Sequence, residues 1–254
     1  MFRNGAILLA LSLLVGACTT NEDEALGDGR LVTIDDAGNI ATLEPDGTDI
    51  VVVADDGGGR VTYFQPIWSP DGSRISATRS EAGTFSTEII DADTGERTST
   101  VTASNAFFQY WSPDGSKLAT LAVTAPGDLG LDLFSIGEGS DPVRVADGQP
   151  LYFSWSPDSA NVVGHIDNAP LELLIADAES PEYGAPGSFS APQWTEDGII
   201  HIALASRRQQ LTRTQSDGES EPIASTLGGA IFTATPDGQR IAVLPAATDD
   251  VGFS

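Results

Sequence analysis

Short runs in which apolar residues alternate with small or polar residues follow one another along most of this chain. Residues 74–80, 117–123, 161–166 and 240–245 read RISATRS, KLATLAV, NVVGHI and RIAVLP. A period of two residues is typical of β-strands. The aromatic-rich runs TYFQPIW, AFFQYW and LYFSW precede the first three of these segments, a few residues before each. The pattern therefore predicts pairs of β-strands joined by tight turns.

The turn has nearly the same sequence in every pair: WSPDG at 68–72 and 111–115, WSPDS at 155–159, WTEDG at 194–198 and ATPDG at 234–238. Proline presets φ at the second turn position, aspartate tolerates the third, and glycine accepts the left-handed conformation that closes a type I turn with a bulge. The motif residues to which we assign this structural role are Trp68, Asp71, Gly72, Trp111, Asp114, Gly115, Trp155, Asp158, Trp194, Asp197, Gly198, Asp237 and Gly238.

The copies recur at intervals of 39–44 residues, which indicates a repeat architecture. The rest of each period holds two more strand-like runs, for example residues 87–96 and 97–103. Four short strands in about 40 residues are typical of a β-propeller blade. We therefore predict an all-β propeller of five to six four-stranded blades within residues 30–254, with no helix beyond the N-terminal segment.

The sequence does not decide how the ring of blades is closed, because the repeat starts and stops at different points of a blade. About three strands precede the first WSPDG, whereas only one strand-like run, within residues 239–250, follows the last turn, so the sequence begins and ends within a blade. Strands from both termini could complete a shared blade, which removes exposed sheet edges. Alternatively, a six-bladed ring has an incomplete last blade because the chain is truncated at its C-terminus.

The turn motif resembles the WD-like repeat of TolB-type β-propellers, and the resemblance covers roughly residues 30–245. Three positions depart from it: Ser159 replaces the turn glycine, Glu196 the proline and Ala234 the tryptophan. We expect those blades to be less regular. The resemblance implies a protein or peptide ligand, although propellers host many unrelated functions.

Each tryptophan of the chain opens one copy of the motif. A large ring at one position per blade is expected to pack between neighbouring blades, where it buries much apolar area. The alternative is an aromatic ligand cage, which requires the rings to converge.

Residues 1–17 predict an export signal. A short basic start precedes an apolar stretch of ten residues, 6–15, which is too short to span a bilayer as a helix. Small residues then lead to Cys18, the only cysteine of the chain. This segment resembles a bacterial lipobox, which implies cleavage before Cys18 and lipid attachment to it. The alternative is a signal peptide whose cysteine is incidental. Residues 18–29 then form the lipidated cysteine and a flexible acidic tether.

The charge balance excludes some partners. Asp and Glu total 37 against 12 Lys and Arg, and the net charge is −25. Phosphate binding needs clustered cations, so we expect no nucleic-acid partner. The same charge disfavours docking of the domain itself onto anionic lipid, so contact with the membrane is expected only through the anchor on Cys18.

Few residues suggest catalysis or metal binding, and we predict no cofactor. No G-x-S-x-G motif is present. His165 and His201 are interpreted as strand residues, because a zinc site needs three or four ligands. Asp91 and Asp93 form a weak calcium candidate, since alternate carboxylates before a glycine can wrap the ion, but the bidentate glutamate of an EF-hand loop is missing.

The first strand of each blade should line the central channel, as the resemblance implies, so residues just before each turn are the binding candidates. These are Tyr63, Phe64, Phe107, Phe108, Tyr110, Tyr152 and Phe153. We predict an exported module, anchored to a bacterial membrane, that binds an envelope protein or peptide without catalysis. The alternative is a hydrolase or lyase that acts on glycans or peptides through carboxylates in the funnel.

Overall fold

The computed structural model describes residues 29–101, 106–125, 127–137, 141–167, 169–175, 190–205, 208–226 and 230–245. Within these ranges the chain forms β-strands and no α-helix, as the sequence predicts. Strand pairing divides them into six antiparallel sheets, numbered here in chain order, and each sheet consists of strands that are consecutive in the sequence.

The described part of the chain contains three four-stranded sheets, two three-stranded sheets and one two-stranded sheet. The first sheet contains β1 (Leu31–Ile34), β2 (Ile40–Leu43) and β3 (Val51–Ala54). The second contains β4 (Val61–Trp68), β5 (Arg74–Glu81), β6 (Thr84–Asp91) and β7 (Arg97–Val101). The third contains β8 (Ala106–Trp111), β9 (Lys117–Ala125), β10 (Asp128–Ser135) and β11 (Val143–Gly148). The fourth contains β12 (Leu151–Trp155), β13 (Val162–Ile166) and β14 (Glu172–Leu173). The fifth contains β15 (Gln193–Thr195), β16 (Gly198–Ala205), β17 (Arg208–Thr214) and β18 (Ser220–Thr226), and the sixth contains β19 (Ala230–Ala234) and β20 (Ile241–Pro245).

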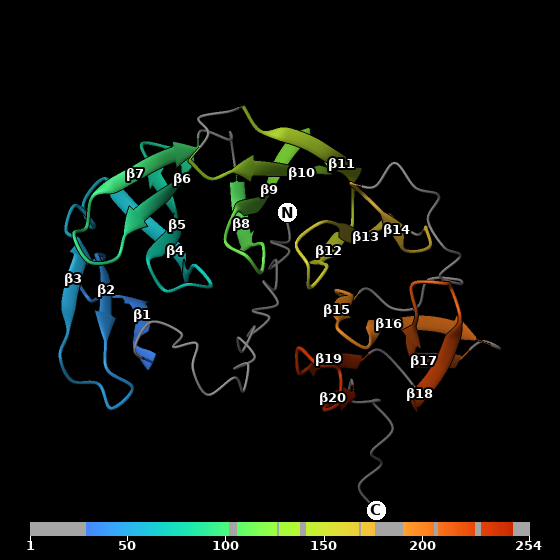
Figure 1. The fold of residues 1–254 in the computed structure, drawn as a ribbon. Helices are drawn as coiled ribbons and strands as arrows, with labels where there is room; N and C mark the ends of the chain where they lie inside the picture. The colour runs from blue at the N-terminus through green and yellow to red at the C-terminus, as the bar shows by residue number, and fades with distance from the viewer. Residues whose placement is uncertain are drawn as a thin grey trace, which may run out of the picture.

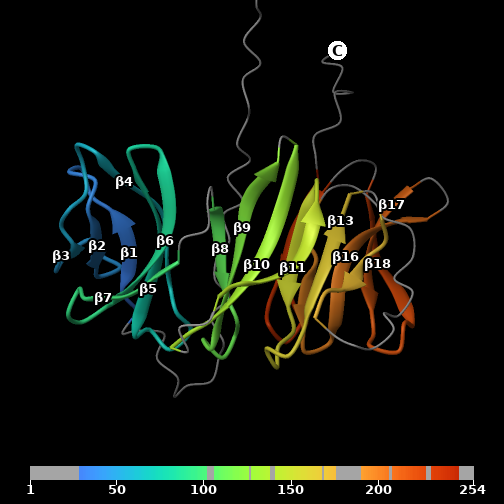
Figure 2. The same cartoon turned by 90° about the horizontal axis from the view of Figure 1, so that it is seen from above.

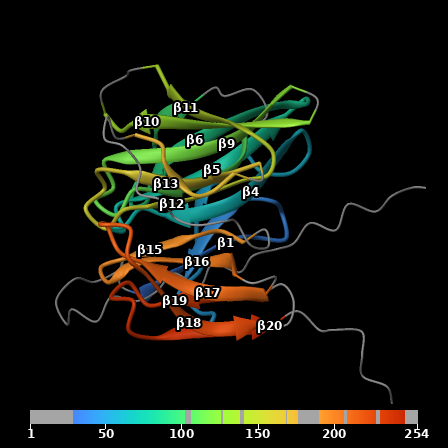
Figure 3. The same ribbon diagram turned by 90° about the vertical axis from the view of Figure 1, so that its right-hand side faces the viewer.

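The six sheets follow one another around a central axis (Figure 1). The strands that precede the turn motifs, namely β4, β8, β12, β15 and β19, lie on the inside, and β3, β7, β11, β14 and β18 lie on the outside. Figure 2 shows the strands standing roughly along this axis, and Figure 3 shows the third, fourth and fifth sheets one after another. The arrangement is that of a β-propeller.

The first and sixth sheets lie at the two ends of the arc. In the described part of the chain, β1–β3 and β19–β20 are separate sheets, so no shared blade is formed by them. The turn 44–48 between β2 and β3 shares its Asp-Gly pair and its backbone hydrogen bonds with the turn 215–219 between β17 and β18, the third and fourth strands of the fifth sheet. The strands of the first sheet are therefore equivalent to the second, third and fourth strands of a complete blade.

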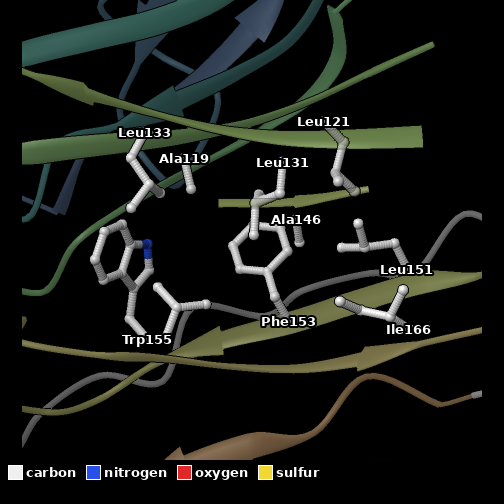
Figure 4. Packing of buried hydrophobic residues seen from close by; sticks show 10 residues of the cluster. Ala119, Leu121, Leu131, Leu133, Ala146, Leu151, Phe153, Trp155 and Ile166 are labelled. Atoms are coloured by element: carbon white, nitrogen blue, oxygen red, sulfur yellow. The ribbon is translucent and has the colours of Figure 1, made fainter. Parts of the chain in front are cut away.

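The hydrophobic core lies between sheets rather than inside one layer. The largest cluster joins Leu131 and Leu133 of the third sheet to Phe153 and Trp155 of the fourth (Figure 4). Equivalent clusters join the first sheet to the second, the second to the third, the fourth to the fifth and the fifth to the sixth. Each sheet is thus stabilised mainly by its neighbours, as in other repeat proteins.

Candidate functional site

The turn motif is held by a repeated set of hydrogen bonds. Ser69 Oγ donates to Asp71 Oδ1 at 2.6 Å and accepts from the backbone N–H of Arg74 at 2.9 Å. Gly72 takes φ +70°, in the left-handed region that the sequence predicts. The same serine or threonine to aspartate bond occurs in the turns that contain Asp114, Asp158 and Asp237. In these four copies the turn is held mainly by its own residues, and its aspartate carboxylate already accepts hydrogen bonds.

The departures from the motif change the turn locally. Ser159 adopts φ +61° in the glycine position, and its Oγ accepts a hydrogen bond from the backbone N–H of Asp114 in the preceding turn, at 3.0 Å. Partial burial raises the pKa of Asp114, but hydrogen bonds from Ser112, Ser116 and Ser159 outweigh it and lower the pKa to about 2. In the WTEDG copy, Thr195 pairs directly with Gly198, so this hairpin is shorter than the others.

The motif tryptophans lie against the clusters that join neighbouring sheets. Trp111 and Trp155 are 4% and 2% exposed, and Trp68 and Trp194 are half-buried beside their clusters. Each ring occupies a different boundary between sheets. Their arrangement therefore corresponds to the packing interpretation and brings no tryptophan cage together.

Side chains of the inner strands also bond to the backbone of the next inner strand. Gln109 Nε2 donates to the carbonyl oxygen of Gln65 at 2.8 Å, which links β8 to β4. The backbone N–H of Trp194 donates to Ser154 Oγ at 2.9 Å, which links β15 to β12. Gln193 donates to the carbonyl of Phe232 and accepts from the N–H of Ala234, which links β15 to β19. These bonds fix the spacing of the inner strands around the axis.

The aromatic candidates separate into a buried and an exposed group. Tyr63 is 2% exposed, and its hydroxyl donates to Asp56 Oδ1 at 2.7 Å and accepts from Arg97 at 2.7 Å. Phe108 and Phe153 stack edge to face across the boundary of the third and fourth sheets, with centroids 6.1 Å apart. These three side chains stabilise contacts between sheets, and half-buried Tyr152 pairs with His165 across β12 and β13.

The exposed group consists of Phe64, Phe107 and Tyr110, which are 42%, 41% and 39% exposed. They lie on β4 and β8, which are neighbouring inner strands in contact with each other. Surrounding protein desolvates the hydroxyl of Tyr110 and raises its pKa although solvent reaches the ring. Of the seven candidates, these three combine exposure with a position on the inner strands.

Sequence reasoning missed a pair of buried carboxylates. Glu88 on β6 and Asp132 on β10 are 4% and 6% exposed and occupy the same position of successive repeats, three residues before the end of the third strand. Arg144 holds Asp132 through Nε at 2.7 Å and a second nitrogen at 2.9 Å, and Arg97 Nε lies 3.5 Å from Glu88. An acidic residue in the third strand followed by an arginine in the fourth strand is the sequence signal that could have indicated these two ion pairs.

The two histidines meet at the boundary of the fourth and fifth sheets. His165 and His201 are each 5% exposed, two residues after Val163 and Ile199 of the apolar cluster there. Residues two apart on a strand share a face, so both imidazoles point into this boundary. Burial, and secondarily the nearby His165, lower the pKa of His201 to about 4, and its Nε2 hydrogen-bonds Thr214 Oγ1 at 2.9 Å.

The calcium candidate is a turn between β6 and β7. Asp91 Oδ1 accepts from the backbone N–H and the hydroxyl of Thr94, each at 2.8 Å, and these bonds lower its pKa. Asp93 is exposed in the same turn. Among the residues that the structure describes, no group of three or more histidine, cysteine or acidic side chains is placed to hold a metal ion. Cys18 and residues 18–28 of the expected tether lie outside the described residues. The described chain also contains no helix of the length and apolarity needed to cross a bilayer.

No protein-family model matches this chain, and no curated protein matches it. Several solved structures match its fold. TolB from Acinetobacter baumannii is 17% identical with a TM-score of 0.54, over 84% of this chain and 56% of that one. Oligogalacturonate lyase in complex with manganese is 15% identical with a TM-score of 0.59, over 84% and 70%. The propeller domain of the Trilobed protease from Pyrococcus furiosus is 14% identical with a TM-score of 0.55, over 75% and 66%.

These comparisons show the fold. The chain is a TolB-like β-propeller, which confirms the architecture predicted from the turn motif. It spans about half the length of the TolB structure that it matches. The matched structures include TolB, prolyl endopeptidases and a lyase, so the fold alone does not decide the activity.

Proposed function

We propose that this protein is a lipid-anchored, extracytoplasmic β-propeller that binds a protein or peptide at its inner strands and catalyses no reaction. The proposal depends on one observation above all, the exposure of Phe64, Phe107 and Tyr110 on two neighbouring inner strands. Exposed aromatic side chains that gather on one surface are typical of protein-binding sites.

The ionisable groups favour binding over catalysis. A carboxylic acid that works as a general acid needs a raised pKa in a cleft. Within the described residues, every carboxyl group whose pKa departs from its usual value has it lowered, because hydrogen bonds and arginines stabilise the charged form. Such groups are ionised at neutral pH and are poor proton donors.

The location rests on the N-terminal sequence and on the TolB-like fold. The lipobox-like segment supports export and attachment of lipid to Cys18. We expect Cys18→Ala to abolish acylation and to release the protein from the membrane fraction, measured by fractionation and by labelling with a fatty-acid analogue. A variant that stays in the membrane fraction would contradict the anchor.

The binding surface can be tested with paired variants. The double variant Phe64→Ser, Phe107→Ser should lose proteins that the wild type captures from its own envelope after crosslinking. The control Leu244→Ser removes an apolar side chain that is 68% exposed on β20 and should capture them as the wild type does. Equal capture by the double variant, or turnover of a glycan or peptide by the purified protein, would overturn the proposal.

A further inference from the structure

The outer edge of β3 differs from the other outer edges of the molecule. Ile50, Val51 and Val52 are 63%, 47% and 46% exposed. β3 is the last strand of its sheet, and no described strand pairs with its outer side. Figure 1 places it on the outside of the ring. An exposed apolar edge strand is a template for pairing with another chain.

The longer outer strands β7, β11 and β18 contain charged residues or proline, whereas β3 contains neither. β7 begins with Arg97, β11 contains Arg144 and Asp147, and β18 contains Glu221 and Pro222. Charged side chains and proline at an edge disfavour pairing with another chain. Residues 50–53 read IVVV, which combines high β-propensity with no charge and no proline.

The open part of the edge has a defined length. A Cβ atom on Gly95 would lie 2.4 Å from the carbonyl oxygen of Val53, so the turn between β6 and β7 packs directly against the end of β3. Val53 and Ala54 are accordingly buried, at 9% and 6% exposure. The accessible edge therefore comprises residues 50–52, and the neighbouring blade limits it at one end.

Carboxylates flank this edge and indicate the charge of its partner. Asp46 precedes the apolar run and Asp55 follows it, and neither forms an ion pair with a cation in the described residues. The net charge of −25 opposes the approach of a second copy of this chain. The same charge attracts a basic partner.

We propose that the edge at residues 50–52 binds an extended segment of a partner protein that adds a strand to the first sheet. The segment has apolar residues at alternate positions and lysine or arginine at its ends. Main-chain hydrogen bonds supply the pairing, the apolar side chains of the segment, which share one face, cover Val51, and the basic ends meet Asp46 and Asp55. This surface is distinct from the aromatic inner strands.

A labelled peptide of alternating valine and threonine with two lysines at each end tests the proposal by fluorescence anisotropy. We expect saturable binding with a dissociation constant below about 100 µM. Val51→Lys should weaken it at least about tenfold, because it places a charge on the edge and repels the peptide. The matched control Ile223→Lys alters an exposed apolar residue on the outer strand β18, which contains Pro222, and should leave binding within about twofold.

A second peptide separates strand pairing from simple charge attraction. Methylation of alternate backbone nitrogens keeps every side chain and charge but removes the donors, so this peptide should not bind. Equal binding of both peptides, equal binding to Val51→Lys, or no saturable binding would overturn the proposal. Sedimentation of the wild type provides the remaining outcome: self-association abolished by Val51→Lys would assign the edge to a second copy instead.

Discussion

Acid should destabilise this protein at a pH well above that at which its carboxylates titrate, because His201 is buried as a neutral imidazole. Its folded pKa of about 4 lies below the unfolded value of 6.5. Between these two values the unfolded chain binds more protons than the folded one, so stability is lost as the pH falls from 6.5 towards 4. For these two pKa values, the loss between pH 7 and pH 5 is about 2 kcal/mol.

Urea unfolding followed by tryptophan fluorescence at pH 7, 6 and 5 measures this loss. His201→Gln is the control, because glutamine keeps a polar atom within reach of Thr214 Oγ1 but does not titrate. We expect the variant to lose about 2 kcal/mol less than the wild type between pH 7 and pH 5, whatever its stability at pH 7. Burial also lowers the pKa of His165, so part of the pH dependence remains in the variant.

The carboxylates affect the stability of the fold only at lower pH. The lowered pKa values of residues such as Asp114 stabilise the fold above the unfolded value of 3.8, and this stability is lost only as the pH falls through that value towards about 2. A parallel decline of wild type and His201→Gln down to pH 5 would refute the reasoning. So would a free energy of unfolding that stays constant from pH 7 to pH 5 in the wild type.

Three further predictions concern contacts between strands and sheets. Ser159→Ala should destabilise the protein by about 1 kcal/mol more than Ser159→Gly, because both variants lose the bond to Asp114 but only glycine tolerates φ +61° without a Cβ penalty. Urea unfolding measures the stability of both variants, and a more stable alanine variant would contradict the prediction. A double-mutant cycle of Asp132→Ala and Arg144→Ala should give a coupling free energy of about 2 kcal/mol, because Arg144 donates two charge-assisted hydrogen bonds to a carboxylate that is largely buried. Strictly additive losses of stability would show that this ion pair contributes nothing. Trp155→Ala should cost about 3–5 kcal/mol, because it removes a ring that is 2% exposed between the third and fourth sheets; a thermal midpoint close to that of the wild type would argue against packing as the role of the ring.

Much of this fold could be predicted from local sequence signals. The motif turns could be predicted because a serine, an aspartate and a glycine within five residues determine their own hydrogen bonds, and the structure has these bonds around Asp71 and Asp114. The spacing of the copies then required a repeated supersecondary unit. Both signals can be read from the sequence without knowing how neighbouring blades pack against each other.

Contacts between blades could not be predicted in the same way. Tyr63 and Phe64 are adjacent in an aromatic run, but Tyr63 is buried in the cluster that joins the first sheet to the second, whereas Phe64 stays exposed. A bulge in β4 between Phe64 and Ile67 also breaks the simple alternation of faces. The meeting of His165 and His201 likewise depends on how the fourth sheet packs on the fifth, which no spacing within either blade specifies.

The bonds between inner strands have a consequence for how this molecule can vary. In the bonds made by Gln109, Ser154 and Gln193, the partner atom belongs to the main chain of the adjacent blade. The adjacent blade can therefore exchange the side chain at that position without losing the bond, provided that its backbone keeps its path. Each of these bonds constrains one side chain instead of a matched pair, although Gln109 Oε1 also accepts from the hydroxyl of Thr78 on β5 at 3.4 Å. The sequences of blades joined in this way can change one blade at a time, so a single blade can acquire a new surface while the neighbouring blades keep their sequence.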